Sequence, residues 1–355
     1  MSILSKKPLI IAGPCSAESE DQLRTVVDSL QNAQVDIIRA GIWKPRTRPG
    51  TFHGVGARGL RWISEIKKSA KVMFAIEVAT PQHVEMALKA GIDVFWIGSR
   101  STVNPFTVDE IADALRGVDM PVMVKNPINP DLLLWIGALE RFNQAGIKQL
   151  AAIHRGFCTT QTSNYRYMPL WGIPIDLKSR FPEIPLICDP SHIAGKRNLV
   201  FEIAQKALDL DYDGLMVEVH PDPDNALSDA DQQLTPDAFS QLINLLQFRQ
   251  SRASDTVFIT KMEEIRNEID QIDRQIVSAV EARMHLVIKA GIEKMKYNVT
   301  AFQLERWNDI LQSRPEWITN GKTNPELIQE LFKVIHNESI KIQLEIMGKN
   351  SSENN

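Results

Sequence analysis

Two different patterns of hydrophobic residues follow one another along the chain. Up to about residue 250, short runs rich in Val and Ile alternate with longer stretches whose apolar residues recur every three or four positions. Runs that are apolar on both faces, separated by amphipathic helices, are typical of parallel strands covered by helices. The runs that we interpret as strands are PLIIAG (8–13), VDIIRAG (35–41), KVMFAIEV (71–78), VFWIGS (94–99), PVMVK (121–125), QLAAIHRG (149–156), PLICDP (185–190) and GLMVEVH (214–220).

Eight strand-and-helix units within residues 1–250 predict an α/β fold of one particular kind, the (β/α)₈ TIM barrel, which takes up about 250 residues. An open, doubly wound sheet is the alternative. It is less favoured because no glycine-rich fingerprint follows the first strand.

From about residue 258 the strand pattern gives way to a helical one. No Gly or Pro occurs from 258 to 290, and apolar residues recur at spacings of three and four, at Ile265, Ile269, Ile272, Ile276 and Val280. This pattern predicts one long helix, and two more are expected at 301–311 and 325–347. The chain should therefore end in a small all-α domain at 258–348, joined by a linker at 251–257 and followed by a disordered tail at 349–355.

Composition narrows the class of protein. The chain has 355 residues, 43% of them hydrophobic, and a formal net charge of −4, which gives no reason to expect nucleic acid or a membrane surface as a partner. No apolar run has transmembrane length, and the first residues are too polar for a signal peptide. Cys15, Cys158 and Cys188 are odd in number and widely spaced, which favours reduced thiols. We expect a cytoplasmic enzyme that acts on small molecules.

Polar residues follow the predicted strands at their carboxyl ends, which in a barrel of this kind all open onto one face. The seventh run stops at Asp189-Pro-Ser-His192, which alone could be only a turn. The other strand ends add two sets of residues. The first set combines a thiol, an imidazole and two carboxylates, which suit a divalent Mn, Fe, Co or Zn ion, and consists of Cys15, His192, Glu218 and Asp229.

The second set is a ring of cations with too few acids to neutralise it. Its members are Arg39, Lys44, Arg46, Arg100, Lys125 and Arg155. Such a ring is tolerable when an anionic ligand arrives, and phosphates or carboxylates are the groups that arginine and lysine bind best. We therefore expect a phosphorylated or carboxylated substrate.

These motifs together resemble one enzyme family over residues 8–250. The matching segments are AGPCSAES (12–19), RAGIWKPRT (39–47), IGSR (97–100), PVMVKN (121–126), IHRGF (153–157), CDPSHIAGKR (188–197) and MVEVHPDPDNALSDADQQL (216–234). They resemble 3-deoxy-D-arabino-heptulosonate 7-phosphate (DAHP) synthase, which implies condensation of phosphoenolpyruvate with erythrose 4-phosphate, the first step of the shikimate pathway.

The resemblance also implies a role for each residue. The metal ligands would be Cys15, His192, Glu218 and Asp229, and the phosphoenolpyruvate ligands would be Arg39, Lys44, Arg100, Lys125 and Arg155. Arg46 and Thr47 would hold the aldose phosphate, with Asp189 near its aldehyde end. Cys15, Lys125, Asp189 and His192 would thus surround the reacting centre, with Lys125 as a proton donor or relay. The group that activates the attacking water stays open, with Glu77 as a weak possibility.

A sibling family, 3-deoxy-octulosonate 8-phosphate synthase, uses the same barrel and phosphoenolpyruvate with arabinose 5-phosphate. Its members typically read Lys-Ala-Asn-Arg where this chain reads Lys-Pro-Arg-Thr at 44–47. The arginine-threonine pair favours the four-carbon aldose.

In the predicted long helix, Arg283 and Lys294 interrupt the apolar stripe. Eleven residues return to nearly the same face of a helix, so the two cations point the same way about 16 Å apart. Charged groups on a packing face are costly unless they are paired. Residues 258–348 resemble the all-helical class of chorismate mutase, which implies a substrate site of Arg266, Arg283, Lys294, Gln303, Arg306, Ser339 and Gln343. Many relatives have an Asp and a Glu where this chain has Gln303 and Trp307, which leaves the contact to the substrate hydroxyl open.

Three interpretations of this domain stay open: a working mutase, a ligand-binding sensor and a dimerising bundle. Arg266 and Arg283 are seventeen residues apart, about 25 Å along a helix, which is too far for one ligand of chorismate's size. We therefore expect Arg266 to come from a partner chain in a two-fold homodimer, with higher assembly left open. Because the first strand begins at about residue 8, leaving no room for a regulatory domain before the barrel, we also expect feedback inhibition to act through the helical domain.

Overall fold

The computed structural model describes residues 2–31, 33–45, 50–160, 163–250 and 253–353. The chain divides into two compact units, residues 1–251 and 252–355. Among the described residues, no helix combines the length and the apolar character that crossing a membrane would require.

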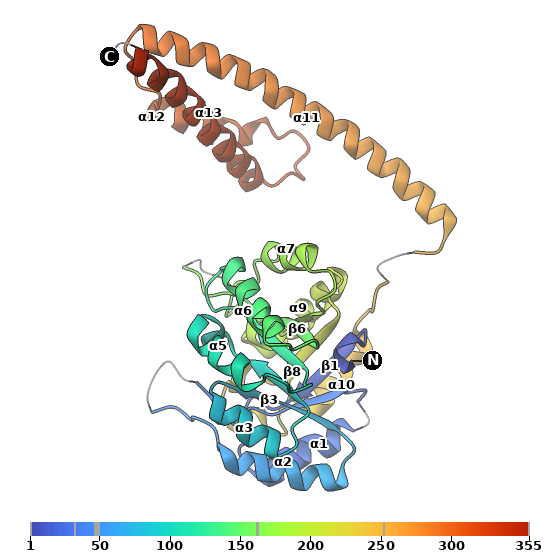
Figure 1. Ribbon diagram of the computed structural model, residues 1–355. Coiled ribbons are helices and arrows are strands. Elements are labelled where there is room, and N and C mark those ends of the chain that lie inside the picture. Colours follow the sequence, from blue (N-terminus) through green and yellow to red (C-terminus); the bar gives the residue numbers. More distant parts are fainter. Residues whose placement is uncertain (1, 32, 46–49, 161–162, 251–252, 354–355) are drawn as a thin grey trace. The chain divides into compact units, whose positions relative to one another are not determined.

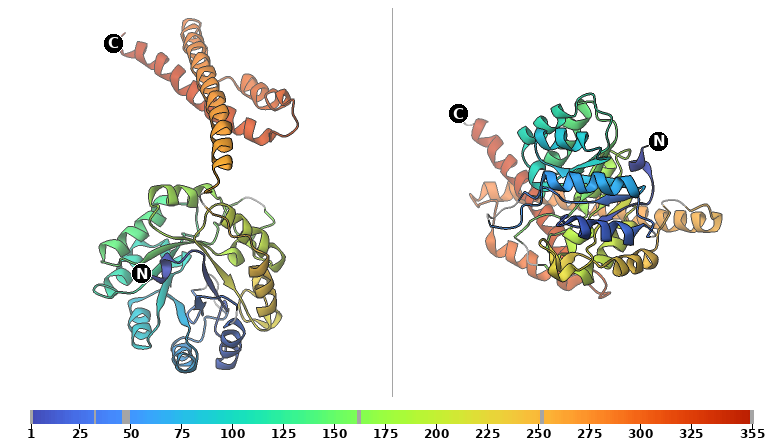
Figure 2. Two further views of the ribbon diagram at one scale, coloured as in Figure 1. Left: turned by 90° about the vertical axis from the view of Figure 1, so that its right-hand side faces the viewer. Right: turned by 90° about the horizontal axis from the view of Figure 1, so that it is seen from below.

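The first unit is built on a closed barrel of parallel strands, in which each strand pairs with the next along the chain and β8 pairs with β1. The strands are β1 (Leu9–Gly13), β2 (Ile37–Arg39), β3 (Met73–Val78), β4 (Val94–Ile97), β5 (Val122–Lys125), β6 (Leu150–His154), β7 (Leu186–Cys188) and β8 (Gly214–Glu218). The closed order confirms the predicted barrel and rules out the open sheet. The views in Figures 1 and 2 show the strands surrounded by helices.

Helices follow the strands and cover the outside of the barrel. They are α1 (Glu20–Leu30), α2 (Ala57–Ser69), α3 (Pro81–Lys89), α4 (Ser99–Thr102), α5 (Pro105–Ala114), α6 (Leu132–Gln144), α7 (Gly172–Arg180), α8 (Pro190–Ala194), α9 (Val200–Asp209) and α10 (Pro236–Leu245). Short 3-10 turns occur at η1 (Ile3–Ser5), η2 (Arg197–Leu199), η3 (Pro223–Asn225) and η4 (Ala230–Gln232). Several helices begin at a side-chain cap, as at Ser19, Thr80 and Asp131, whose oxygens accept backbone N–H groups of the first turn.

Side chains fill the barrel, so the interior is a packed core rather than a channel. Ile11, Trp96 and Met216 are among the fully buried residues that meet inside it. Leu4, from the η1 turn before β1, belongs to the same cluster and closes it at the amino ends of the strands. The carboxyl ends of the strands are therefore the face on which a site can form.

The second unit consists of α11 (Thr256–Lys296), α12 (Leu304–Ser313) and α13 (Pro325–Glu353), with a 3-10 turn η5 (Pro315–Trp317). The 41 residues of α11 give a helix about 60 Å long. It extends beyond residue 290, the end of the Gly- and Pro-free segment, and includes Gly291. A Cβ at Gly291 would lie 3.1 Å from side-chain atoms of Gln343 and Ile346, so the glycine lets α13 pack closely against α11.

The helical unit differs from the expectation at its end and in its exposure. The backbone of α13 continues to Glu353, whereas we expected a disordered tail from 349, because adding residues to an existing helix costs far less than starting one. In the amino-terminal half of α11, Ile265, Ile269, Ile272 and Ile276 are 39–55% exposed. A regular stripe of half-exposed isoleucines is unusual on a free surface.

Candidate active sites

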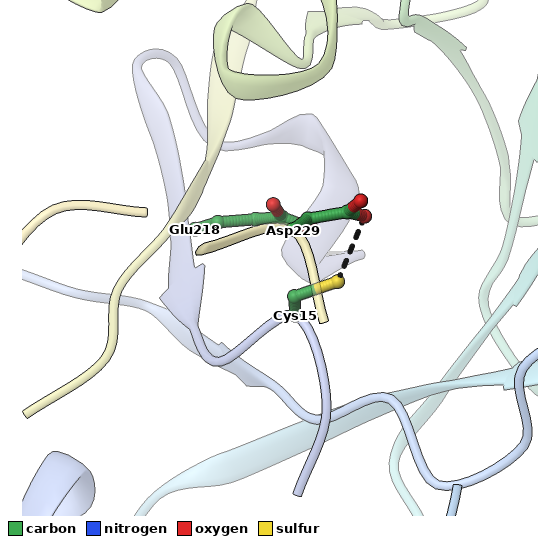
Figure 3. Close-up of side chains that lie close together, drawn as sticks. All are labelled: Cys15, Glu218 and Asp229. Carbon is green, nitrogen blue, oxygen red and sulfur yellow. Dashed lines mark hydrogen bonds between the residues drawn. The ribbon is translucent and has the colours of Figure 1, made fainter. Parts of the chain in front are cut away.

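Three of the four predicted metal ligands lie together at the carboxyl ends of the barrel strands. Cys15 follows β1, Glu218 ends β8, and Asp229 lies in the loop beyond it. One donor atom from each lies within 4.8 Å of the others, and Figure 3 shows the three side chains converging. The Cys15 thiol donates to Asp229 Oδ2 at 3.2 Å, and the backbone N–H of Cys15 is held by Gln233 Oε1 at 2.9 Å.

His192, the fourth predicted ligand, faces the same carboxylates from α8. Its Nε2 lies 4.0 Å from Asp229 Oδ2, and its Nδ1 lies 3.8 Å from Glu218 Oε1. Asp189 determines its position in two ways, because Asp189 Oδ1 caps α8 by accepting the backbone N–H of His192 at 3.1 Å while Oδ2 lies 2.8 Å from the ring Nδ1. The turn-like run Asp-Pro-Ser-His is thus both a helix start and part of the site.

This donor set fits a divalent transition metal. A thiol, two carboxylates and a nearby imidazole suit Mn, Fe, Co or Zn, and the thiol and Glu218 are fully buried. Burial, together with the charges of Glu218 and Asp229, raises the pKa of Cys15 to about 12, although Lys44 opposes this from 3.0 Å. A positive ion at the same place would reverse the balance and favour the thiolate.

The predicted cations surround this cluster. Lys44, Arg100, Lys125 and Arg155 line one cavity together with His192 and Asp229. Arg39 is buried, with Nη2 3.0 Å from Glu218 Oε1 and its guanidinium 5.2 Å from the centre of the Trp96 ring. Arg46 and Thr47 lie outside the described residues.

Lys125 has the environment of a group that can give up a proton. Its Nζ lies 2.7 Å from Asp189 Oδ2. Burial lowers the pKa of Lys125, the nearby Arg39 and Arg155 lower it further, and Asp189 opposes the change.

Glu77 also lines the cavity, and a glycine determines where it lies. Trp96 Nε1 donates to Glu77 Oε2 at 3.3 Å. A Cβ at Gly98 would lie only 2.1 Å from Glu77 Oε1. The carboxylate can therefore occupy this place only because residue 98 has no side chain.

Sequence reasoning missed two residues here, Arg166 and Tyr167. Arg166 Nη1 donates to Asp229 Oδ1 at 2.9 Å, and the Arg155 guanidinium lies 3.6 Å from the centre of the Tyr167 ring. Both come from the long loop after β6, which a bridge between Phe157 and Met168 folds back over the strand end. The loop has no hydrophobic period, so only its aromatic and arginine content could have drawn attention to it.

A second site lies within the helical unit. Six of the seven predicted chorismate ligands line one cavity of about 280 Å³, namely Arg283, Lys294, Gln303, Arg306, Ser339 and Gln343. Arg283 Nη1 donates to Ser339 Oγ at 2.6 Å. Arg266 is not among the residues that line the cavity, and it lies in the exposed half of α11.

Arg314 and His336 line the same cavity and were not predicted. The pKa of Arg283 is lowered by burial and by the neighbouring Arg314 and Arg306. Cations this close to one another favour an anionic ligand. His336 could have been found from its position one turn before Ser339 on α13, since residues three apart share a helix face.

Two protein-family models match the chain, one over each unit. The model of the DAHP synthetase I family matches residues 5–253. The chain belongs to this family. A second family model, chorismate mutase type II, matches residues 265–344 of this DAHP synthetase I family member. The enzyme is therefore bifunctional, a DAHP synthase followed by a chorismate mutase, as the motifs had indicated.

Individual relatives of this DAHP synthase are distant. Phospho-2-dehydro-3-deoxyheptonate aldolase of Thermotoga maritima is 29% identical over 234 residues, covering 66% of this chain and 67% of the relative. The crystal structure of DAHP synthase from the same organism superposes with a TM-score of 0.60 at 26% identity, covering 67% of each chain. A 2-dehydro-3-deoxyphosphooctonate aldolase of Desulfotalea psychrophila is 24% identical over 257 residues, covering 67% of this chain and 88% of the relative.

Proposed function

We propose that the barrel condenses phosphoenolpyruvate with erythrose 4-phosphate and that the reaction depends on a divalent metal. The observation that carries this proposal is the buried cluster of Cys15, Glu218 and Asp229, with donor atoms within 4.8 Å of one another, beside a ring of cations. His192 completes the ligand set. A metal bound there supplies Lewis-acid polarisation of the aldehyde carbonyl.

The ring of cations binds phosphoenolpyruvate. This substrate carries a carboxylate and a phosphate, and cations on neighbouring strand ends can hold both groups in one orientation. The proposed ligands are Arg39, Lys44, Arg100, Lys125 and Arg155. Tyr167, against the guanidinium of Arg155, supports this wall of the site.

Lys125 supplies the proton that the aldehyde oxygen takes up, and Asp189 orients Lys125. Asp189 holds the Lys125 ammonium at 2.7 Å and the His192 ring at 2.8 Å, so a single carboxylate orients both. Lys125 donates or relays a proton to the oxygen of the aldehyde as the new carbon–carbon bond forms. Glu77 takes the proton of the water that adds at the second carbon before phosphate leaves. Arg46 and Thr47 bind the aldose phosphate.

The length of the aldose substrate distinguishes the proposed DAHP synthase reaction from that of 3-deoxy-octulosonate 8-phosphate synthase. Relatives named 2-dehydro-3-deoxyphosphooctonate aldolase match the chain at 24% identity. Lys-Pro-Arg-Thr at 44–47 favours erythrose 4-phosphate. The test compares kcat/KM for erythrose 4-phosphate and arabinose 5-phosphate on the purified enzyme. A higher value for arabinose 5-phosphate would assign the barrel to the sibling reaction.

The helical cavity binds chorismate and accelerates its rearrangement to prephenate. Arg283, Lys294 and Arg306 take the carboxylates and the ether oxygen, and the buried amide of Gln343 reaches the ether oxygen. No nucleophile is needed, because a pericyclic reaction is accelerated by holding the compact conformer and stabilising charge on the breaking bond.

The enzyme is a homodimer through α11, and Arg266 belongs to the site of the partner. The half-exposed isoleucines of the amino-terminal half of α11 support this proposal, because a second copy of the helix running antiparallel would cover them. Prephenate or chorismate bound in the helical unit inhibits the synthase. Such inhibition requires the ligand to bind two states of the enzyme with different affinities.

A further inference from the structure

The helical cavity is rich in hydrogen-bond donors and poor in acceptors. Four cations line it, Arg283, Lys294, Arg306 and Arg314, and guanidinium and ammonium groups only donate. Chorismate brings two carboxylates and an ether oxygen that such donors suit. It also brings one ring hydroxyl, whose proton needs an acceptor.

The polar side chains that could accept this proton differ in how many hydrogen bonds they already make. Ser339 Oγ already donates to the backbone of Ile335 and accepts from Arg283, both at 2.6 Å. The amide nitrogen of Gln343 donates to the backbone oxygen of Ser339 at 3.2 Å. Gln343 Oε1 is also buried without a hydrogen-bond partner among the described residues, but this side chain is already assigned to the ether oxygen. His336 Nε2 is buried and has no hydrogen-bond partner among the described residues.

The ring of His336 is fixed on two sides. It stacks on Trp307 with the ring centres 4.2 Å apart and 18° between the planes, and Phe302 meets it nearly edge-on at 6.1 Å. His336, Ser339 and Gln343 follow one another at spacings of three and four, so all three project from one face of α13. The ring that carries the unpartnered nitrogen thus lies in the wall of the cavity, with Nε2 itself covered from solvent.

We propose that His336 accepts a hydrogen bond from the ring hydroxyl of chorismate and that Trp307 positions it to do so. The inference rests on the proposed mutase site. It gives Trp307 a role in the site, because the indole ring stacks on His336 with the ring centres 4.2 Å apart. Trp307 cannot accept the hydroxyl proton, but its ring orients a residue that can.

The charge state of His336 suits this role. Burial lowers its pKa, and the facing cations Arg283 and Lys294 of α11 lower it further. The other charged groups that line the cavity are Arg306 of α12 and Arg314 after its end. His336 is the one histidine among the described residues that line the cavity, and its lowered pKa favours the neutral form, which offers the acceptor.

The test compares His336→Leu with His285→Leu in the full chain. His285 is an exposed residue of α11 that does not line the cavity. We expect His336→Leu to lower kcat/KM for chorismate about tenfold, as for one hydrogen bond between uncharged groups, and His285→Leu to leave it unchanged. The wild-type value should fall as the pH drops through the pKa of His336, and the His336→Leu variant should lack this fall.

A ligand lacking the donor isolates the contact. With chorismate methylated on the ring hydroxyl, wild type and His336→Leu should show the same kcat/KM or the same affinity. Trp307→Ala should lower kcat/KM for chorismate in the wild type but hardly change it in the His336→Leu background. Trp307→Phe should retain the aromatic stacking on His336 and therefore the activity. Equal losses with both ligands, or an unchanged pH profile, would overturn the role of His336. A wild-type enzyme that neither binds nor converts chorismate would instead refute the mutase site itself. An unchanged thermal unfolding curve of the helical unit, followed by circular dichroism, shows that each variant is folded.

Discussion

Gly98→Ala should slow the synthase by displacing Glu77. The added Cβ would lie 2.1 Å from Glu77 Oε1 and 2.8 Å from its carboxyl carbon. Because carbon and oxygen atoms pack at about 3.5 Å, the carboxylate must retreat by more than about 1 Å. The backbone itself tolerates alanine, since residue 98 has φ −74° and ψ 155°.

The size of the effect follows from this displacement. A misplacement of about 1 Å at a reacting group costs about 100-fold in rate. The broken bond from Trp96 Nε1 to Glu77 Oε2 costs only about 1 kcal/mol of stability. We therefore expect kcat to fall by about two orders of magnitude while the variant stays folded and its KM for phosphoenolpyruvate changes little.

Steady-state kinetics of the synthase and thermal unfolding measure the two effects. Gly172→Ala is the matched control, because a Cβ there meets nothing within 4 Å and its φ lies outside the left-handed region. Adding Glu77→Asp to Gly98→Ala shortens the side chain by one methylene and should restore part of the rate. If Gly98→Ala is as fast as Gly172→Ala, the position of Glu77 is irrelevant to turnover. A rise in KM alone would mean that the cation ring moved instead.

Chelation should abolish the synthase and spare the mutase, and added Mn, Fe, Co or Zn should restore it; loss of both activities while the helical unit stays folded would contradict this division. Metal uptake should release a proton, because burial raises the pKa of Cys15 to about 12 in the metal-free site and the bound ligand is the thiolate; calorimetry in buffers of different ionisation enthalpy should show less release for Cys15→Ser. Arg266→Ala and Arg283→Ala should each be nearly inactive as mutases, and mixed dimers should regain one site in two, since both lesions then fall in the same site; dimers that mix without recovery would exclude action across the interface. Prephenate should inhibit the synthase of the full chain and not that of residues 1–250, and equal responses would remove the helical unit from regulation.

Most of what could be predicted for the barrel came from the spacing of its hydrophobic residues and from the polar residues at the carboxyl ends of its strands. Parallel strands bring their carboxyl ends to one face whatever the sequence between them, so Cys15, Glu218 and Asp229 could be grouped before any coordinates. Arg166 and Tyr167 could not be assigned to the site from the sequence. The loop that carries them shows no regular spacing of hydrophobic residues, and it returns to the site through one isolated β-bridge.

In the helical unit, periodicity predicted the helices but not all of the lining of the cavity. Arg314 and His336 reach it because α13 packs on α11 and α12 packs on α13, which spacing along one helix does not specify. Gly291 could not be interpreted from the sequence for a similar reason. An isolated glycine lowers the expectation of helix, but here the close packing of α13 at Gln343 favours a residue without a side chain.

The exposed stripe on α11 also bears on how the chain is synthesised. Translation completes residues 1–251 before α11 leaves the ribosome, so the barrel can fold first as a unit. Ile265, Ile269 and Ile272 then emerge on a helix that can form locally within microseconds. Because this apolar surface follows the barrel in the sequence, it emerges only after the barrel has been synthesised, which shortens the time during which it can bind an incompletely folded barrel and cause aggregation.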